Sequence, residues 1–200
     1  PFLDRLAGLR FAGTVRALPE GTPVFPTEPL LEVTAPLLEA QIVETMVLNE
    51  VHLQTVIASK AVRSVEAAGG ARLVDFALRR THGGEAGLKV ARASYLAGFD
   101  ATSNVLAGRT YGIPIAGPMA HSYVEAFGDE TEAFRAFARA YPDDAILLVD
   151  TYDTVQGTRH AITIADELAA AGHRLRGVRL DSGDIVELSA RVREILDEAG

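Results

Sequence analysis

The chain has 200 residues, with 19 Lys and Arg, 27 Asp and Glu, and a formal net charge of −8 at pH 7. Hydrophobic residues make up 48% of the sequence and charged residues only 23%, which predicts a globular fold with a buried core rather than a disordered chain. The negative charge argues against nucleic acid or a membrane surface as a partner, since both need a basic patch. Without cysteine, disulfides, thiol nucleophiles and Cys-ligated zinc are excluded. No signal peptide or long apolar run is evident, so we expect a cytoplasmic protein.

The first third of the chain is expected to contain short strands followed by a long helical segment. Residues 13–18 and 22–33 carry β-favouring residues between several prolines, a pattern typical of edge strands and turns. Apolar residues then recur at helical spacing over residues 37–68, interrupted only by Asn49 and Glu50. This pattern predicts one long helix or two abutting helices.

After Gly69 the sequence alternates between short apolar runs and amphipathic segments that end at glycine. This alternation predicts parallel strands joined by crossover helices, in either an open doubly wound sheet or a barrel. Five strands are only part of an eight-stranded barrel, which takes roughly 250 residues. The expected strands are 71–78, 102–105, 113–116, 145–149 and 175–180, and the expected helices are 85–96, 122–141, 154–171 and 185–199.

Polar residues lie at or near the end of each expected strand, and one of these groups also includes a methionine. In parallel α/β folds the carboxyl ends of the strands share one face, so these side chains should converge on a single site. The groups are Arg79, Arg80 and His82; Ser103 and Asn104; Met119 and His121; Asp150 and Asp153; and Arg179 and Asp181.

The first of these groups suits an anion. Arg79 and Arg80 offer planar forks that match carboxylate or phosphate, and the following glycines, Gly83 and Gly84, let backbone N–H groups approach it. The alternative is surface ion pairs with Asp75 and Glu85.

His121 is a candidate base, ligand or phosphoryl acceptor because it stands at a strand end before a helix. The alternative is a histidine that caps the helix or is half-buried. The other four histidines show no spacing typical of a metal site, which disfavours a zinc enzyme.

Asp150 and Asp181 are the carboxylates at the ends of the last two strands. Such carboxylates suit sugar hydroxyls or Mg²⁺, which takes one or two carboxylates together with substrate phosphates. Helix capping is the competing interpretation for Asp153, Ser182 and Asp184.

Five motifs, in order, resemble nicotinate phosphoribosyltransferase: DFALRRTHG, AGFDATSNVLAG, YGIPIAGPMAHSYV, LLVDTYDT and GVRLDSGD. The resemblance runs from about Phe25 onward. It implies an α/β fold: residues 1–68 as part of an N-terminal α/β sandwich with a connecting helix, and residues 69–200 as a partial, irregular α/β barrel. The chain would then be an internal fragment of that enzyme.

The resemblance also implies an activity. Members of the family condense nicotinate with phosphoribosyl pyrophosphate to nicotinate mononucleotide and pyrophosphate in NAD biosynthesis, coupled to ATP hydrolysis through a phosphohistidine. Mg²⁺ and ATP are therefore expected to bind, and the family commonly forms homodimers. A nicotinamide- or quinolinate-using relative, or a piece that binds ligand without turnover, are the alternatives.

Residue by residue, the resemblance implies that Phe76 and Arg179 sandwich the pyridine ring and that Arg79 contacts phosphate. Asp150 and Asp181 match carboxylates near the ribose and Mg²⁺, and His121 matches the phosphorylated histidine. Catalytic roles thus fall to His121, Asp150, Asp181 and Arg179, and substrate contacts to Phe76, Arg79, Arg80, Thr102, Ser103, Ser182 and Gly183.

Ser103 predicts which pyridine is used. The nicotinamide-using relative carries an aspartate there, which would repel the carboxylate of nicotinate, whereas a serine hydroxyl can donate to it. The chain departs from the family at Ala77, Ala101 and Pro118, of which Pro118 removes a backbone donor near the loop of His121.

Overall fold

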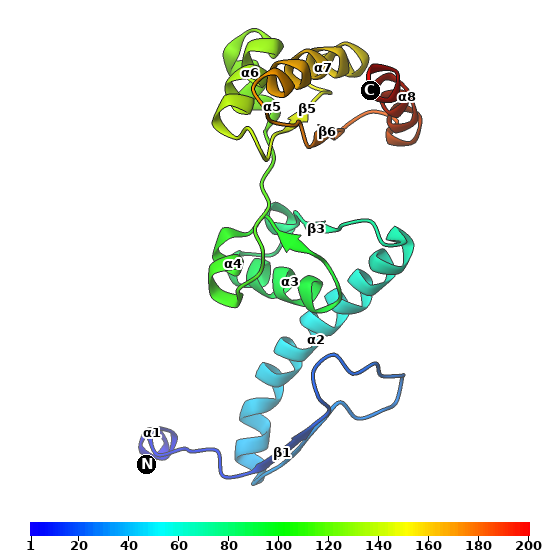
Figure 1. Ribbon diagram of the computed structural model, residues 1–200. Coiled ribbons are helices and arrows are strands. Elements are labelled where there is room, and N and C mark those ends of the chain that lie inside the picture. Colours follow the sequence, from blue (N-terminus) through cyan, green and yellow to red (C-terminus); the bar gives the residue numbers. More distant parts are fainter. The chain divides into compact units, whose positions relative to one another are not determined.

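The computed structural model describes residues 1–200, which form two compact units, residues 1–116 and residues 117–200 (Figure 1). The division falls at a different position from the domain boundary expected after Ala68. The reason is that α2 (Leu37–Ala68) packs against α3 (Gly84–Leu96), which joins the long helix to the residues that follow it. The sandwich and barrel domains stay a prediction.

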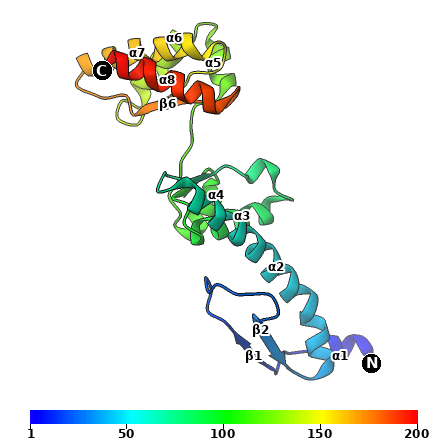
Figure 2. The same cartoon turned by 90° about the vertical axis from the view of Figure 1, so that its right-hand side faces the viewer.

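The first unit begins with α1 (Phe2–Ala7) and an antiparallel pair, β1 (Thr14–Ala17) and β2 (Leu31–Thr34) (Figure 2). The strand expected over residues 22–33 is wrong for residues 22–30, which form a loop. Prolines at three of these positions lack the N–H that a ladder needs, and Thr27 has a φ of 76° that a strand does not allow.

Helix α2 confirms the long helix predicted over residues 37–68, and it runs through Asn49 and Glu50 without a break. It ends at Gly69, which adopts the left-handed conformation with φ 56° and ψ 33°.

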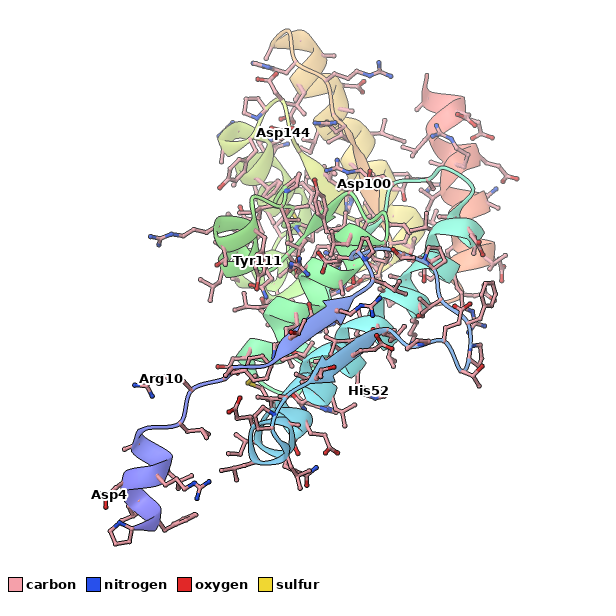
Figure 3. The ribbon with its side chains drawn as sticks, turned by 90° about the horizontal axis from the view of Figure 1, so that it is seen from below. Asp4, Arg10, His52, Asp100, Tyr111 and Asp144 are labelled. Atoms are coloured by element: carbon pink, nitrogen blue, oxygen red, sulfur yellow. The ribbon has the colours of Figure 1, made fainter.

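The rest of the first unit is a βαβ element. Strand β3 (Val74–Asp75) pairs in parallel with β4 (Ala101–Thr102), and α3 crosses between them. Asp100, labelled in Figure 3, fixes this register, because its Oδ2 accepts the N–H of Leu73 at 2.7 Å and its own N–H donates to the Leu73 carbonyl.

Three expected strands are shorter than predicted here. The run 71–78 turns after Asp75 into a 3-10 helix, η1 (Leu78–Arg80). The run 102–105 stops because Asn104 caps a helix that the sequence did not predict, α4 (Val105–Tyr111), by accepting the N–H of Ala107. The strand expected at 113–116 is reduced to one parallel bridge between Thr102 and Ile115.

The second unit is another βαβ element with additional helices. Its parallel strands lie in register with Leu147 opposite Val178. The helix expected over 122–141 is broken, because Gly128 has a φ of 70° and Asp129 caps a new helix. The elements are α5 (His121–Phe127), α6 (Glu130–Ala140), β5 (Ile146–Leu148), α7 (Thr154–Ala170), β6 (Gly177–Arg179) and α8 (Ile185–Ala199).

The core of the second unit lies around β5. Leu147 and Leu148 are buried, together with Phe134 of α6 and Ile164 of α7, and α6 and α7 lie side by side (Figures 1 and 2). Gly157 brings α7 close to the end of β5: a β-carbon there would lie 2.2 Å from the Val149 carbonyl oxygen. The start of α7 is thereby fixed against the segment that follows β5 and leads to Asp150.

The fold is mixed α/β, and the predicted parallel βα units are confirmed in both units. The strands form three separate two-stranded sheets, however, rather than one continuous sheet. The barrel itself stays a prediction. None of the helices combines the length and the apolar character needed to cross a membrane.

Candidate active site

The predicted site residues fall into two groups, one in each compact unit. The first unit holds Phe76, Arg79, Arg80, Thr102 and Ser103 at the ends of β3 and β4. The second holds His121, Asp150, Arg179, Asp181, Ser182 and Gly183 around the ends of β5 and β6. Within each unit the structure brings the strand ends together as predicted. Convergence of the two groups, including the expected Phe76 and Arg179 sandwich, stays a prediction.

His121 is the first residue of α5, and polar groups of the protein lie near both nitrogens of its imidazole. Nδ1 lies 3.2 Å from the hydroxyl oxygen of Thr151, and Nε2 lies 3.6 Å from Oδ2 of Asp181. The helix cap is Ala120, so the capping interpretation of His121 is wrong. The side chain is 37% exposed, and a ligand can therefore reach an imidazole whose orientation is already set.

Asp150 joins the end of β5 to the loop after β6. Its Oδ2 accepts the N–H of Asp181 at 2.8 Å and the hydroxyl of Ser182 at 2.6 Å. Its Oδ1 is buried and has no hydrogen-bond partner among the residues of the protein. A buried acceptor without a donor is costly, and a ligand hydroxyl or a metal ion would satisfy it.

Arg179 is oriented by two acceptors of the second unit. Its Nη2 donates to Oδ1 of Asp181 at 2.8 Å, and its Nη1 donates to the Met119 carbonyl at 3.3 Å. Asp181 therefore lies between the guanidinium and the imidazole of His121. One carboxylate thus contacts the guanidinium and lies close to the imidazole, so that both groups can face a substrate from the same side chain.

The capping interpretations are resolved by the side-chain contacts. Asp153 caps α7 by accepting the N–H of Gln156, and Asp184 caps α8 by accepting the N–H groups of Val186 and Glu187. Ser182 does not cap a helix, because its hydroxyl donates to Asp150.

The structure has no group of three or more His, Cys, Asp or Glu side chains placed to hold a metal ion. Mg²⁺ does not require such a group, since one or two carboxylates with substrate phosphates and waters complete its shell. The free Oδ1 of Asp150 has the donor chemistry for this role. Asp181 is less suited, because its two oxygens face Arg179 and His121.

In the first unit, Phe76, Arg79 and Arg80 are exposed after β3, and the two arginines lie on η1. Asp75 is not their ion-pair partner: its oxygens accept the N–H of Ala77 and the hydroxyl of Thr102. Exposed guanidinium groups at a strand end can bind carboxylate or phosphate.

Ser103 lies at the end of β4 between two buried residues. Its N–H donates to the Asp75 carbonyl at 2.8 Å. Thr102 beside it is fully buried, and its hydroxyl donates to Asp75. Ser103 is only partly buried, so it is the hydroxyl of this strand end that a ligand can reach.

Sequence reasoning missed the contacts of two residues at these strand ends, Thr151, which it did not single out, and Asp75, which it considered only as an ion-pair partner of the arginines. Asp75 carried a signal, because it is an acidic residue inside an apolar run that predicts a buried strand. Thr151 carried none beyond its place between Asp150 and Tyr152, since its contact joins positions 30 residues apart.

Comparison with known proteins gives two family matches. Residues 1–52 match the nicotinate phosphoribosyltransferase N-terminal domain, and residues 71–199 match the nicotinate phosphoribosyltransferase family. The chain is 58% identical over 201 residues to the nicotinate phosphoribosyltransferase pncB2 of Mycobacterium tuberculosis, a match that covers 100% of this chain and 42% of that protein. It is 46% identical over 187 residues to the nicotinate phosphoribosyltransferase of Bacillus subtilis, covering 92% and 37%.

Solved structures agree. A crystal structure of human nicotinic acid phosphoribosyltransferase matches with a TM-score of 0.90 and 35% identity, covering 99% of this chain and 49% of that one. Nicotinate-nucleotide pyrophosphorylase from Pyrococcus furiosus matches with a TM-score of 0.83 and 28% identity, covering 95% and 49%. The chain thus spans less than half the length of the curated relatives it matches.

Proposed function

The chain belongs to the nicotinate phosphoribosyltransferase family, and from this membership we propose that its complete polypeptide condenses nicotinate with phosphoribosyl pyrophosphate, coupled to ATP hydrolysis. The products would be nicotinate mononucleotide, a precursor in NAD biosynthesis, and pyrophosphate. The observation that carries the proposal is the position of Asp181, which accepts a hydrogen bond from Arg179, lies 3.6 Å from His121 and donates its N–H to Asp150.

The proposed reaction is a displacement at the anomeric carbon of the ribose. The pyridine nitrogen forms a bond to this carbon with its lone pair, and the bond to the pyrophosphate oxygen breaks with its electrons leaving on pyrophosphate. The protein must therefore stabilise a departing anion and a cationic sugar ring. Arg79 and Arg80 are suited to the phosphates, because their exposed guanidinium groups can each donate two parallel hydrogen bonds.

Asp150 is proposed to bind the phosphoribosyl pyrophosphate substrate. Its free Oδ1 can accept a ribose hydroxyl or bind Mg²⁺ together with substrate phosphates. When bound, Mg²⁺ would neutralise negative charge on the leaving pyrophosphate. The bonds that Oδ2 accepts from Asp181 and Ser182 keep the carboxylate oriented for this.

His121 is proposed to accept the γ-phosphoryl group of ATP: a lone pair of a neutral imidazole nitrogen forms the N–P bond, and the bond from this phosphorus to the β–γ bridging oxygen breaks with its electrons leaving on ADP. Its imidazole is exposed enough for a nucleotide to approach, and Thr151 and Asp181 restrict its rotation. Such preorganisation lowers the cost of reaching the reactive geometry. A phosphoryl group would place new negative charge beside Asp181 and Arg179, which gives ATP a physical route to change the neighbouring loops.

Three side chains are proposed to recognise the pyridine. Phe76 and Arg179 would each offer a flat surface to the ring, and Ser103 would donate a hydrogen bond to the carboxylate of nicotinate. A homodimeric assembly and a cytoplasmic location are further expectations that rest on the resemblance alone.

The test uses the complete polypeptide with nicotinate, nicotinamide and quinolinate as separate substrates. We expect turnover with nicotinate, stimulated by ATP, and labelling by γ-phosphate of ATP that is acid-labile and base-stable. His121→Ala should abolish the label, whereas His173→Ala, which removes a histidine paired with Asp143 in the same unit, should retain it. Preference for another pyridine would reject the substrate, and labelling that survives in His121→Ala would reject the role of His121.

A further inference from the structure

Asp75 is an acidic residue at the end of β3 whose carboxylate accepts hydrogen bonds from neutral groups rather than from a Lys or Arg side chain. The residue is 5% exposed. Oδ1 accepts the N–H of Ala77 at 2.9 Å, and Oδ2 accepts the hydroxyl of Thr102 at 2.8 Å. Burying a carboxylate is expensive unless its oxygens are bonded, so these two neutral donors determine where the group can lie.

The contact with Thr102 continues into β4 and α4. The Thr102 hydroxyl oxygen accepts the N–H of Asn104 at 3.0 Å, so its single proton is left for Asp75. The Asn104 side chain in turn accepts the N–H of Ala107, which starts α4. A continuous series of hydrogen bonds therefore runs from the turn after β3 to the first turn of α4.

Two exposed or partly exposed side chains lie on this series. Phe76 lies between Asp75 and Ala77 in the chain, and the Asp75 carboxylate accepts the N–H of Ala77. This hydrogen bond fixes the backbone turn that carries the exposed side chain of Phe76. Ser103 stands between Thr102 and Asn104, and its own N–H donates to the Asp75 carbonyl. Asp75 therefore contacts Ala77 on the far side of Phe76, and it reaches the two neighbours of Ser103, Thr102 directly and Asn104 through the Thr102 hydroxyl.

We propose that Asp75 is a positioning residue that, through Ala77 and Thr102, fixes Phe76 and Ser103 relative to each other so that they can bind the ring and the carboxylate of a pyridine carboxylic acid. The substrate part of this proposal rests on the proposed function. The positioning part rests only on contacts within the first unit.

The test compares four variants of the complete polypeptide. Asp75→Asn replaces one acceptor by a donor, and Thr102→Val removes the hydroxyl while keeping the shape. Thr102→Ser keeps the hydroxyl and should rescue. Val90→Ala is the control, because it creates a cavity at a buried position of α3 in the same unit, and the valine side chain takes no part in these hydrogen bonds.

Two measurements are made on each variant. The first is the steady-state KM and kcat for nicotinate, where Asp75→Asn and Thr102→Val should raise KM about tenfold, corresponding to roughly 1.4 kcal/mol, with a smaller change in kcat. The second is hydrogen exchange of peptides covering residues 74–80 and 101–107, where the same variants should lose protection that Val90→Ala retains.

The outcomes separate the two parts. If the unmodified protein does not use nicotinate, the proposed function fails, and the exchange measurement alone decides the positioning role. Two results would overturn that role. One is a KM for nicotinate that rises equally in Val90→Ala and Thr102→Val. The other is hydrogen exchange in Asp75→Asn that is unchanged in residues 74–80 and 101–107. Failure of Thr102→Ser to restore KM and protection would overturn it as well.

Discussion

The Nδ1 atom of His121 lies 3.2 Å from the hydroxyl oxygen of Thr151. Thr151 directly follows Asp150, so the segment between β5 and α7 supplies both a carboxylate and a group that orients the imidazole. On the other side of the ring, Nε2 faces Asp181 at 3.6 Å. The orientation of His121 therefore depends on the ends of both strands of the second unit, not on α5 alone.

This relationship predicts that Thr151→Val slows labelling of His121 by ATP. Valine keeps the shape of threonine but cannot hydrogen-bond, and loss of one hydrogen bond of about 1 kcal/mol corresponds to roughly a fivefold change. Thr151→Ser retains the hydroxyl and should be labelled at nearly the rate of the unmodified protein. The measurement is the initial rate of phosphohistidine formation, and a valine variant as fast as the serine variant would show that the contact is incidental.

Ser103→Asp should weaken the preference for the acid. A carboxylate at this strand end repels the carboxylate of nicotinate and can accept from the amide of nicotinamide. We expect the ratio of kcat/KM for nicotinate over nicotinamide to fall by about tenfold or more, since a like-charge contact of 1.4 kcal/mol suffices. Ser59→Asp, on the exposed side of α2, makes the same change of charge elsewhere in the unit and should leave the ratio unchanged. An equal ratio in both variants would place selectivity at another residue.

Much of the fold could be predicted because long amphipathic segments carry their own periodic signal. Residues 37–68, 154–171 and 185–199 became helices almost at their predicted ends. Strand lengths were overestimated because apolar residues continue beyond the last ladder hydrogen bond, as after Asp75. Helix α4 was missed because it is short and its main signal is a single capping residue, Asn104.

The site was predictable in its residue types but not in its contacts. Arginines, aspartates, a serine and a histidine at strand ends could be read directly, because parallel strands end on one face. Which side chains meet is a tertiary property. The free Oδ1 of Asp150 depends on the course of the loop after β6, and the bond from Thr102 to Asp75 depends on the register of β3 against β4. No local pattern specifies either.

Glu130 should make the stability of the second unit depend on pH. Its side chain is 6% exposed, Oε2 lies 2.8 Å from Nδ1 of His160, and Oε1 is buried without a partner. Burial raises the pKa of Glu130 above its ordinary value of 4.5; His160 opposes this, and the negative charges of Asp129 and Asp153 add to it. Because the pKa is raised in the folded state, the stability that the protonated group contributes is present below its unfolded pKa and is lost as pH rises through the folded pKa.

In Glu130→Gln the side chain cannot ionise, so the stability of this variant should not fall as the pH rises through the pKa of Glu130. The Tm of this variant minus the Tm of the unmodified protein should therefore increase as pH rises from about 4 to about 7, whatever constant offset the amide introduces. Differential scanning calorimetry over this range gives the two values. Glu198→Gln, at an exposed position of α8, is the control and should show a flat difference. A difference for Glu130→Gln that is flat or decreasing with pH would contradict the assignment.

Gly157→Ala should destabilise the second unit by separating α7 from β5. A β-carbon at this position would lie 2.2 Å from the Val149 carbonyl oxygen, and a backbone atom cannot move aside as the end of a side chain can. We expect a loss of about 1–3 kcal/mol of unfolding free energy, the usual cost of forcing extra volume into a packed contact. Gly177→Ala, in β6 of the same unit, is the matched control, because its β-carbon meets no atom within 4 Å. Urea unfolding of both variants measures the difference. Equal midpoints would mean that the close approach of α7 to β5 does not hold the strand end that carries Asp150.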